Sequence, residues 1–241
     1  MNIGMLGSGE VAKALSRGFL KYNHSVMLGT RHPEKLGEWS SMNPDAKIGS
    51  FADAAAFGEL IILAVKGSAA SAVLHSAGAA NLKGKTVMDA TNPIADVPPV
   101  NGVLKFTTNL EQSLMEALQK EFPEARFVKA FNCVGHACMV DPKFKDGKPT
   151  MFICGNDAPA KRSVGKVAEQ FGWEVADMGG AESARAIEPL SMLWCIPGFQ
   201  RNDWNHAFKL LKQPAPMPNF PNSGEAAQRG GPTAFQWIKL W

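Results

Sequence analysis

The sequence predicts an α/β protein with a doubly wound parallel sheet, followed by a small C-terminal helical lobe. Over residues 1–179, short aliphatic runs alternate with alanine-rich stretches of helical period. Parallel strands joined by crossover helices produce this alternation. From residue 180 the apolar spacing is helical only. We therefore expect one sheet domain over residues 1–179, and a lobe with a proline-rich tail over residues 180–241.

Each expected element is an apolar run bounded by turn residues. Strands are expected at residues 2–6, 25–28, 60–65, 86–89, 126–131, 151–154 and 173–177. Helices are expected at residues 10–22, 51–57, 68–78, 109–121 and 158–171. The helix near residue 109 follows the capping-box spacing of Thr108 and Glu111, in which each side chain satisfies a backbone N–H of the first turn.

The lobe is expected to contain two helical pieces. The first is AESARAIEPLSMLW, where Pro189 should bend or restart the helix, and the second is NDWNHAFKLLK at residues 202–212. Residues 213–232 are rich in Pro, Asn and Gly, yet the chain ends in FQWIKLW. The aromatic residues at this end, Phe235, Trp237 and Trp241, should pack either on the core of this chain or on a second copy. A homodimer through the C-terminal region is the favoured expectation.

Composition excludes several classes of protein. The hydrophobic fraction of 45% and the charged fraction of 20% over 241 residues are typical of a globular protein. The net charge of +3 comes from scattered Lys and Arg residues, which argues against a nucleic-acid partner. The spacing of the four cysteines fits neither a zinc site nor a disulfide framework, so we expect reduced thiols and no metal. With no signal-peptide pattern, and with LIILAV too short to span a bilayer, a cytoplasmic location and no membrane partner are expected.

A glycine motif directly follows the first expected strand. In GMLGSGEVAKAL, Gly7 allows a tight turn, Gly9 lets the backbone approach a pyrophosphate, and Ala12 allows close packing of helix and strand. This context, a strand before and a helix after, is typical of a Rossmann dinucleotide site. The Glu10 carboxylate favours the helix dipole but would repel a diphosphate, so we expect it to point away. The residues expected here are Gly7, Ser8, Gly9, Glu10 and Val11.

The end of the second strand indicates which dinucleotide binds. NAD-binding proteins place an acid there for the ribose 2′-hydroxyl, whereas NADP-binding proteins supply an arginine. Here LGTRHPEK places Thr30 and Arg31 at that position, with Lys35 one turn later. A hydroxyl and two cations suit a 2′-phosphate, so the sequence predicts NADP(H).

Loops that leave the other strands should line the nicotinamide half of the site, because ligands bind at the carboxyl ends of parallel strands. The residues expected there are Ala64, Val65, Lys66, Asn92, Pro93 and Asn132. The two asparagine amides suit a carboxamide or a substrate carbonyl, although Asn before Pro is also a common turn. No catalytic residue is identified. Asn132 and His136 are candidates, while Cys133 lacks a partner base at useful spacing, and His32 is read as a surface residue.

Five stretches in this order, GMLGSGEVAKAL, LGTRHPEK, MDATNPI, VKAFN and ARAIEPL, resemble the NADP oxidoreductases that depend on coenzyme F-420. That family is related to the cytosolic domains of membrane ferrireductases, and the resemblance covers most of residues 1–212. It implies a Rossmann domain that holds NADP(H), and a helical lobe, commonly at a dimer interface, that closes over a flat acceptor. The proline-rich tail after residue 212 departs from the pattern.

The expected function is therefore hydride transfer between NADPH and a small-molecule acceptor such as a deazaflavin or a flavin. Transfer between two rings needs positioning and exclusion of water more than a general acid, which agrees with the lack of an obvious catalytic dyad. Two alternatives stay open. One is an NADP-dependent dehydrogenase or reductase of a small carbonyl or hydroxy acid, which would need a proton relay. The other is a non-catalytic NADP(H)-binding sensor or scaffold.

Overall fold

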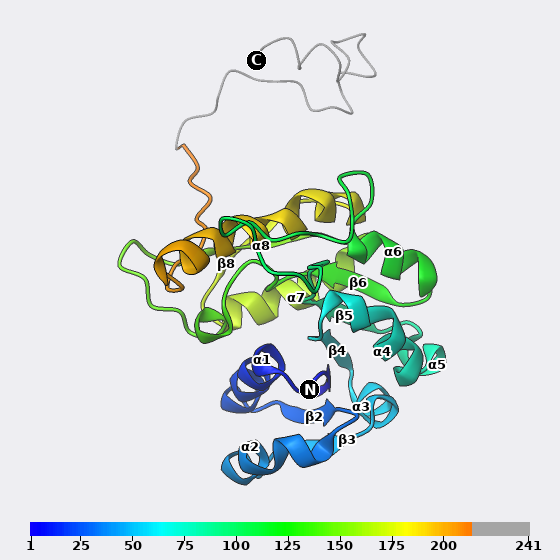
Figure 1. Ribbon diagram of the computed structural model, residues 1–241. Helices are drawn as coiled ribbons and strands as arrows, with labels where there is room; N and C mark the ends of the chain where they lie inside the picture. Colours follow the sequence, from blue (N-terminus) through cyan, green and yellow to red (C-terminus); the bar gives the residue numbers. More distant parts are fainter. Residues whose placement is uncertain (214–241) are drawn as a thin grey trace. The chain divides into compact units, whose positions relative to one another are not determined.

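A computed structural model describes residues 1–213 of the chain (Figure 1). The chain divides into a compact unit, Met1–Lys209, and a second unit, Leu210–Trp241. Every helix and strand of the described residues lies in the first unit. Because this unit contains both the sheet and the helix that follows residue 180, a domain boundary at 179/180 stays a prediction. The expected packing of the aromatic C-terminal end concerns residues outside the described part.

The main sheet has six parallel strands in the order β3, β2, β1, β4, β5, β6. They are β1 (Asn2–Leu6), β2 (Ser25–Gly29), β3 (Lys47–Gly49), β4 (Leu60–Leu63), β5 (Thr86–Asp89) and β6 (Arg126–Lys129). The order reverses beside β1, which confirms the doubly wound Rossmann arrangement. The loops after β1 and β4 diverge at this point, so a crevice opens at the carboxyl ends of the two strands.

A second, parallel pair of strands follows, β7 (Thr150–Ile153) and β8 (Glu174–Asp177). An antiparallel bridge between Lys129 and Cys154 joins the end of β6 to the end of β7. All seven expected strands are present. Strand β3 was not expected, because its three residues, KIG, are too few to show an alternating pattern.

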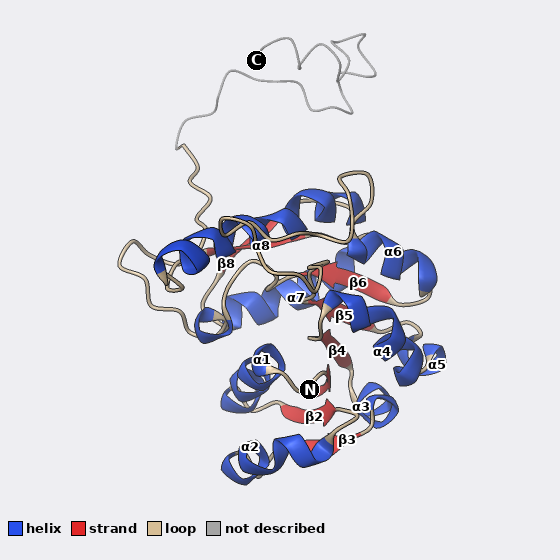
Figure 2. Ribbon diagram, viewed as in Figure 1, coloured by secondary structure: helices blue, strands red, loops and turns tan. Residues whose placement is uncertain are grey.

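Helices cover both faces of the main sheet (Figure 2). One face carries α1 (Glu10–Lys21), α2 (Gly37–Met42) and α7 (Ala158–Gln170), and the other carries α3 (Phe51–Phe57), α4 (Ala70–Ala77), α5 (Ala79–Leu82) and α6 (Leu114–Glu121). Alternate residues of β4 serve the two cores: Leu60 and Ile62 face α1, while Ile61 and Leu63 face α3 and α4. The helix expected at residues 68–78 ends at Ala77, because Gly78 has φ +87°.

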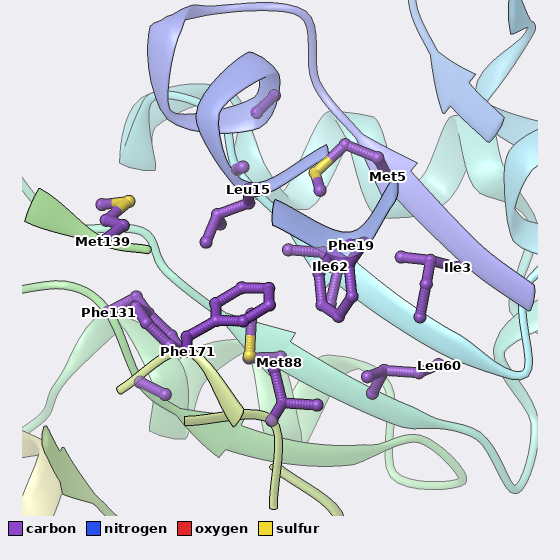
Figure 3. Close-up of a cluster of buried hydrophobic side chains, with 14 of the residues drawn as sticks. Ile3, Met5, Leu15, Phe19, Leu60, Ile62, Met88, Phe131, Met139 and Phe171 are labelled. Atoms are coloured by element: carbon purple, nitrogen blue, oxygen red, sulfur yellow. The ribbon is translucent and has the colours of Figure 1, made fainter. Parts of the chain in front are cut away.

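The core on the α1 face packs aromatic rings between helices and sheet (Figure 3). Phe19 of α1 contacts Phe171, which directly follows α7, with ring centroids 5.0 Å apart. Phe131, beyond β6, lies 6.0 Å from Phe171. These side chains are fully buried. They tie the end of β6 to the first helix, which carries the glycine motif.

Helix α6 begins at Leu114, so the capping box expected at Thr108 is wrong. The box is formed by Ser113 and Glu116 instead, while the Asn109 side chain accepts from the backbone of two following residues in a turn. The carboxylate of Glu188 also accepts from the Leu114 and Met115 N–H groups. This long-range contact stabilises a helix start at residue 114.

As far as residue 213, the lobe contains one α-helix rather than two. Helix α8 (Ala184–Arg201) runs through Pro189 and Pro197 without restarting. It ends at Asn202, which has a left-handed φ of 54°. The helix expected at residues 202–212 is wrong for its described residues, because Trp204 turns back over Gly198 and the Phe208 carbonyl accepts from Thr150 N at the start of β7. Of the helices in residues 1–213, none is long and apolar enough to cross a bilayer.

Candidate functional site

The turn between β1 and α1 has the geometry of a phosphate-binding loop. Gly7 has φ +138°, and a Cβ there would lie 2.2 Å from the Ala64 carbonyl oxygen, so protein packing itself requires glycine. Gly9 is different, because a Cβ there would meet no described atom within 4 Å. Gly9 is the N-cap of α1 and has no capping side chain, so the first N–H groups of the helix face open space. Packing of the described residues therefore does not require glycine at position 9, and the open space lets a ligand approach the backbone.

A cleft of about 510 Å³ opens above this turn. It contains ten of the expected residues: Gly7, Ser8, Gly9, Glu10, Val11, Thr30, Arg31, Ala64, Val65 and Lys66. It also contains five residues that the sequence reasoning did not assign to the site: His32, Phe51, Ala69, Val73 and Ala90. Since these residues follow β1, β2, β4 and β5, the cleft lies at the carboxyl edge of the sheet, where such folds bind nucleotides.

The end of β2 presents a cation and a hydroxyl to the cleft. Arg31 is exposed and forms no ion pair with any described residue. The Thr30 hydroxyl accepts from His32 N at 3.1 Å and lies 3.0 Å from Ser8 Oγ. If Ser8 donates in that pair, the Thr30 hydrogen is available to a ligand. His32 Nδ1 lies 3.1 Å from Glu34 Oε1.

Of the charged residues expected at the site, Lys35 lies outside the cleft and Glu10 lines it. Lys35 is exposed on the 3-10 turn Pro33–Leu36 and lies outside the cleft lining. Glu10 lines the cleft and forms an ion pair with Lys13 at 3.1 Å. The hydrogen bond from Lys13 lowers the pKa of Glu10. Lys66, at the end of β4, is paired with Asp96 at 2.6 Å, and both side chains are exposed.

Two asparagines form a pair at the ends of β5 and β6. Asn92 Nδ2 donates to the Asn132 carbonyl at 2.7 Å, and Asn132 Nδ2 donates to Asn92 Oδ1 at 3.1 Å. Asn132 Nδ2 also donates to the Ile187 carbonyl of α8 at 2.9 Å. Asn132 is 4% exposed, and its Oδ1 accepts no hydrogen bond from the described residues. An orphaned buried acceptor of this kind suits an amide N–H of a ligand.

The other candidates lie apart from this pair. His136 is exposed on the short turn His136–Cys138 and faces α1, in a separate hollow of about 280 Å³ that Arg17 and Asp141 also line. Burial raises the pKa of Cys133 to about 12, so its thiol is a poor nucleophile at neutral pH. All four cysteines are free thiols in the structure. Within residues 1–213, no His, Cys, Asp and Glu side chains gather into a metal site.

A buried charge network, formed by Asp89, Lys129 and Glu188, adjoins the asparagine pair. The Lys129 ammonium lies 2.7 Å from Asp89 Oδ2 and 3.0 Å from Glu188 Oε1, and it donates to the Thr91 carbonyl at 2.9 Å. The exposed fraction is 0% for Asp89 and Lys129 and 1% for Glu188. Burial lowers the pKa of Lys129, but the two carboxylates outweigh burial and leave that pKa raised. Lys129 is therefore a buried cation.

Sequence reasoning missed this network. Its members lie within MDATNPI, VKAFN and ARAIEPL, three of the stretches that carry the family resemblance. A charge at the end of an apolar strand was the available signal, since Lys and Asp are seldom buried unless they are paired. No short-range spacing shows that the three residues meet, because Asp89 and Glu188 are about 100 positions apart in the chain.

Comparison with known proteins gives consistent matches. The family described as coenzyme F420-dependent NADP oxidoreductase matches residues 2–93. A crystal structure from Arthrobacter sp. FB24, provisionally named an F420-dependent NADP reductase, is 32% identical and superposes with a TM-score of 0.82. The alignment covers 87% of this chain and 99% of that one.

Two curated relatives are metalloreductases that this chain matches over only part of their length. Metalloreductase STEAP3 of Rattus norvegicus is 32% identical over 200 residues, and metalloreductase STEAP2 of Homo sapiens is 27% identical over 206 residues. These alignments cover 81% and 82% of this chain. The chain spans 38% of the length of each relative.

Proposed function

We propose that this chain, which belongs to the family of coenzyme F420-dependent NADP oxidoreductases, binds NADPH in the cleft and passes its hydride to a flat acceptor such as a deazaflavin or a flavin. Family membership follows from the 32% identical bacterial structure, 99% of which is covered by the alignment. Bound NADPH supplies the hydride. The residues of this chain bind the cofactor, orient its nicotinamide end and exclude water.

The observation that carries this proposal is the open space at Gly9. That space, together with the free N–H groups of α1, suits a pyrophosphate. Arg31 lies in the same cleft without an acidic partner among the described residues, which suits the 2′-phosphate of NADPH. Beyond the cleft lining, at the end of β6, the orphaned Oδ1 of Asn132 suits the N–H of a carboxamide. The three features therefore suit three parts of NADPH: the pyrophosphate, the 2′-phosphate of the adenosine and the carboxamide of the nicotinamide.

The choice of a flat acceptor rests on the side chains at the nicotinamide end. Asp89, Lys129 and Glu188 adjoin the asparagine pair, but all three side chains are buried, so they are not placed to exchange protons with a substrate. Reduction of a carbonyl or an imine would need such a proton donor. Transfer between two stacked rings would not.

The test is anaerobic oxidation of NADPH, followed by the absorbance of the reduced nicotinamide, with one acceptor at a time. The acceptors are coenzyme F420, FAD, FMN, a ferric chelate and a small ketone. We expect turnover with a deazaflavin or a flavin. Turnover with the ketone alone would favour a carbonyl reductase. Tight NADPH binding without turnover on any acceptor would favour a sensor or scaffold.

We also propose that the chain acts in the cytoplasm as a homodimer through its C-terminal region. The four free thiols support a reducing compartment. Leu193 of α8 is 55% exposed and Phe199 is 47% exposed, and burial of such side chains favours association. Light scattering of the full chain tests the dimer, and a monomeric mass at micromolar concentration would contradict it.

A further inference from the structure

The backbone that presents Asn132 is in an unfavourable conformation. Phe131, directly before it, has φ +59°, although it is bulky and fully buried. Non-glycine residues rarely adopt this region, and a large side chain does so only where the surrounding structure imposes it. Some feature of the fold must therefore hold residues 129–132 in place.

The buried charge network and α8 fix residues 129–132 in this conformation. Lys129 is bound to Glu188, and Asn132 donates to the carbonyl of Ile187, the residue that precedes Glu188 in α8. Ile187 and Glu188, which are neighbours in α8, therefore bind the chain on both sides of Phe131. In Figure 1, α8 lies across the sheet near β6 and α6.

The network holds the Lys129 ammonium from three sides. It donates to the Thr91 carbonyl and forms ion pairs with Asp89 and Glu188, while Asp89 Oδ2 accepts no hydrogen bond from the described residues. Asp89 Oδ1 accepts from both the N–H and the hydroxyl of Thr91. Glu188 also accepts from the first N–H groups of α6, whose partial positive charge favours a carboxylate. The network therefore fixes the ends of β5 and β6 relative to α8.

The asparagine pair has one polar atom left over. Both hydrogens of Asn132 Nδ2 are donated, to Asn92 and to Ile187, which fixes the direction of its amide. Its Oδ1 is buried and accepts nothing from the described residues. A shift of α8 or of Lys129 would therefore turn this acceptor.

We infer that Glu188 and Lys129 are positioning residues: through Asn132 they set where the nicotinamide ring lies, and thereby the rate of hydride transfer. This inference rests on the proposed function, because it requires NADPH in the cleft. It assigns a role to helix α8 that is separate from nucleotide affinity, which depends on Gly9 and Arg31 in the cleft.

The test compares Glu188→Gln with the matched control Glu116→Gln in the full-length protein. Glu116 also joins α6 to α8, through Arg185, and caps α6 through Ser113, but none of its hydrogen bonds to the described residues reaches the end of β5 or β6. Each variant is measured for NADPH affinity, for the emission spectrum of bound NADPH, and for single-turnover reduction of FAD. Thermal melting confirms that the variants are folded, and Glu188→Asp, which keeps the charge, replaces Glu188→Gln if that protein does not fold.

For Glu188→Gln we expect NADPH affinity within about threefold of the wild type. We expect single-turnover hydride transfer to fall about ten- to a hundredfold, because small displacements of the reacting ring are costly. The emission of bound NADPH should shift toward that of free NADPH, and Glu188→Asp should recover part of both changes. Glu116→Gln should leave rate and emission at their wild-type values.

Equal changes in the Glu188 and Glu116 variants would overturn the inference, because they would show only that α8 docking matters. No change in either variant would also overturn it. The wild type and Glu188→Gln could differ in the emission of bound NADPH as expected, while the wild type reduces no flavin. In that case the proposed acceptor is wrong and the positioning inference stands. If the wild type does not bind NADPH, both fail.

Discussion

The substitution Gly9→Val tests the cofactor site with little disturbance of the fold. Gly9 has φ −79° and ψ −177°, an extended conformation that valine adopts readily, and its Cβ would meet no described atom within 4 Å. The loss of glycine at the N-cap of α1 should cost about 1 kcal/mol. For a chain of this size, that cost lowers Tm by about 2–4 °C. The branched side chain would occupy the space where the pyrophosphate approaches α1.

The expected rise in Tm when the wild type binds NADPH follows from the linkage between binding and folding. NADPH at about one hundred times its Kd stabilises the folded state by about 2.7 kcal/mol, which raises Tm by about 5–11 °C. In Gly9→Val this rise should disappear for both NADPH and NADH, which corresponds to at least about a hundredfold weaker binding. Thermal melts with and without nucleotide measure both effects on one sample.

The matched control is Gly7→Ala. A Cβ at Gly7 would lie 2.2 Å from the Ala64 carbonyl oxygen at φ +138°, so this smaller side chain should destabilise the protein by about 2–6 kcal/mol. Glycine is thus required for packing at one position and for the ligand at the other. A folded Gly9→Val protein that keeps the full NADPH-dependent rise in Tm would refute this reasoning and place the phosphates elsewhere.

Three further substitutions, and a control for one of them, test the charges in the structure. Arg31→Ala should weaken NADPH binding about ten- to a hundredfold and leave NADH binding nearly unchanged, because only NADPH carries the 2′-phosphate; calorimetric titration measures both, and equal losses would contradict the assignment. Lys129→Met should lower the free energy of unfolding by about 3–5 kcal/mol, since two buried carboxylates lose their counter-ion, whereas Lys83→Met, which breaks an exposed ion pair with Glu124, should change it by at most about 1 kcal/mol in the same urea titration. The Arg185 hydrogen bond lowers the pKa of Glu116 from 4.5 to about 2, so the stabilisation from this pair is present above pH 4.5 and lost as pH falls toward 2; Arg185→Ala should flatten the dependence of Tm on pH across that window, and an unchanged slope would show that the pair contributes nothing.

The elements that the sequence predicted correctly are those whose signal is local. The run LIIL of β4 is buried on both faces, so its apolar character shows without knowledge of its neighbours. The glycine motif and Arg31 likewise belong to short stretches with a fixed relation to one strand and one helix, and they line one cleft in the structure. Local periodicity and turn chemistry suffice for these features.

Predictions failed where a distant residue decides a local boundary. The spacing of Thr108 and Glu111 satisfies the capping-box pattern, yet the helix starts at Leu114, where a carboxylate from α8 binds its first N–H groups. Similarly, NDWNHAFKLLK has helical spacing, but Trp204 packs back on α8 and residues 202–209 are not helical. In both cases a tertiary contact outweighs a propensity of a few tenths of a kcal/mol per residue.

The sequence by itself therefore determined seven of the eight strands, most of the helices that cover the main sheet, and the residues after β1 and β2 that line the cleft. Only the tertiary structure decided what surrounds the ends of β5 and β6. Asn92 and Asn132 could be assigned to that region, but their mutual hydrogen bonds, the orphaned Oδ1 and the Asp89, Lys129 and Glu188 network depend on the packing of α8 against two strand ends. The physical reason is that a buried charge is tolerated only with a partner, and the chain can supply that partner from any distance along its sequence.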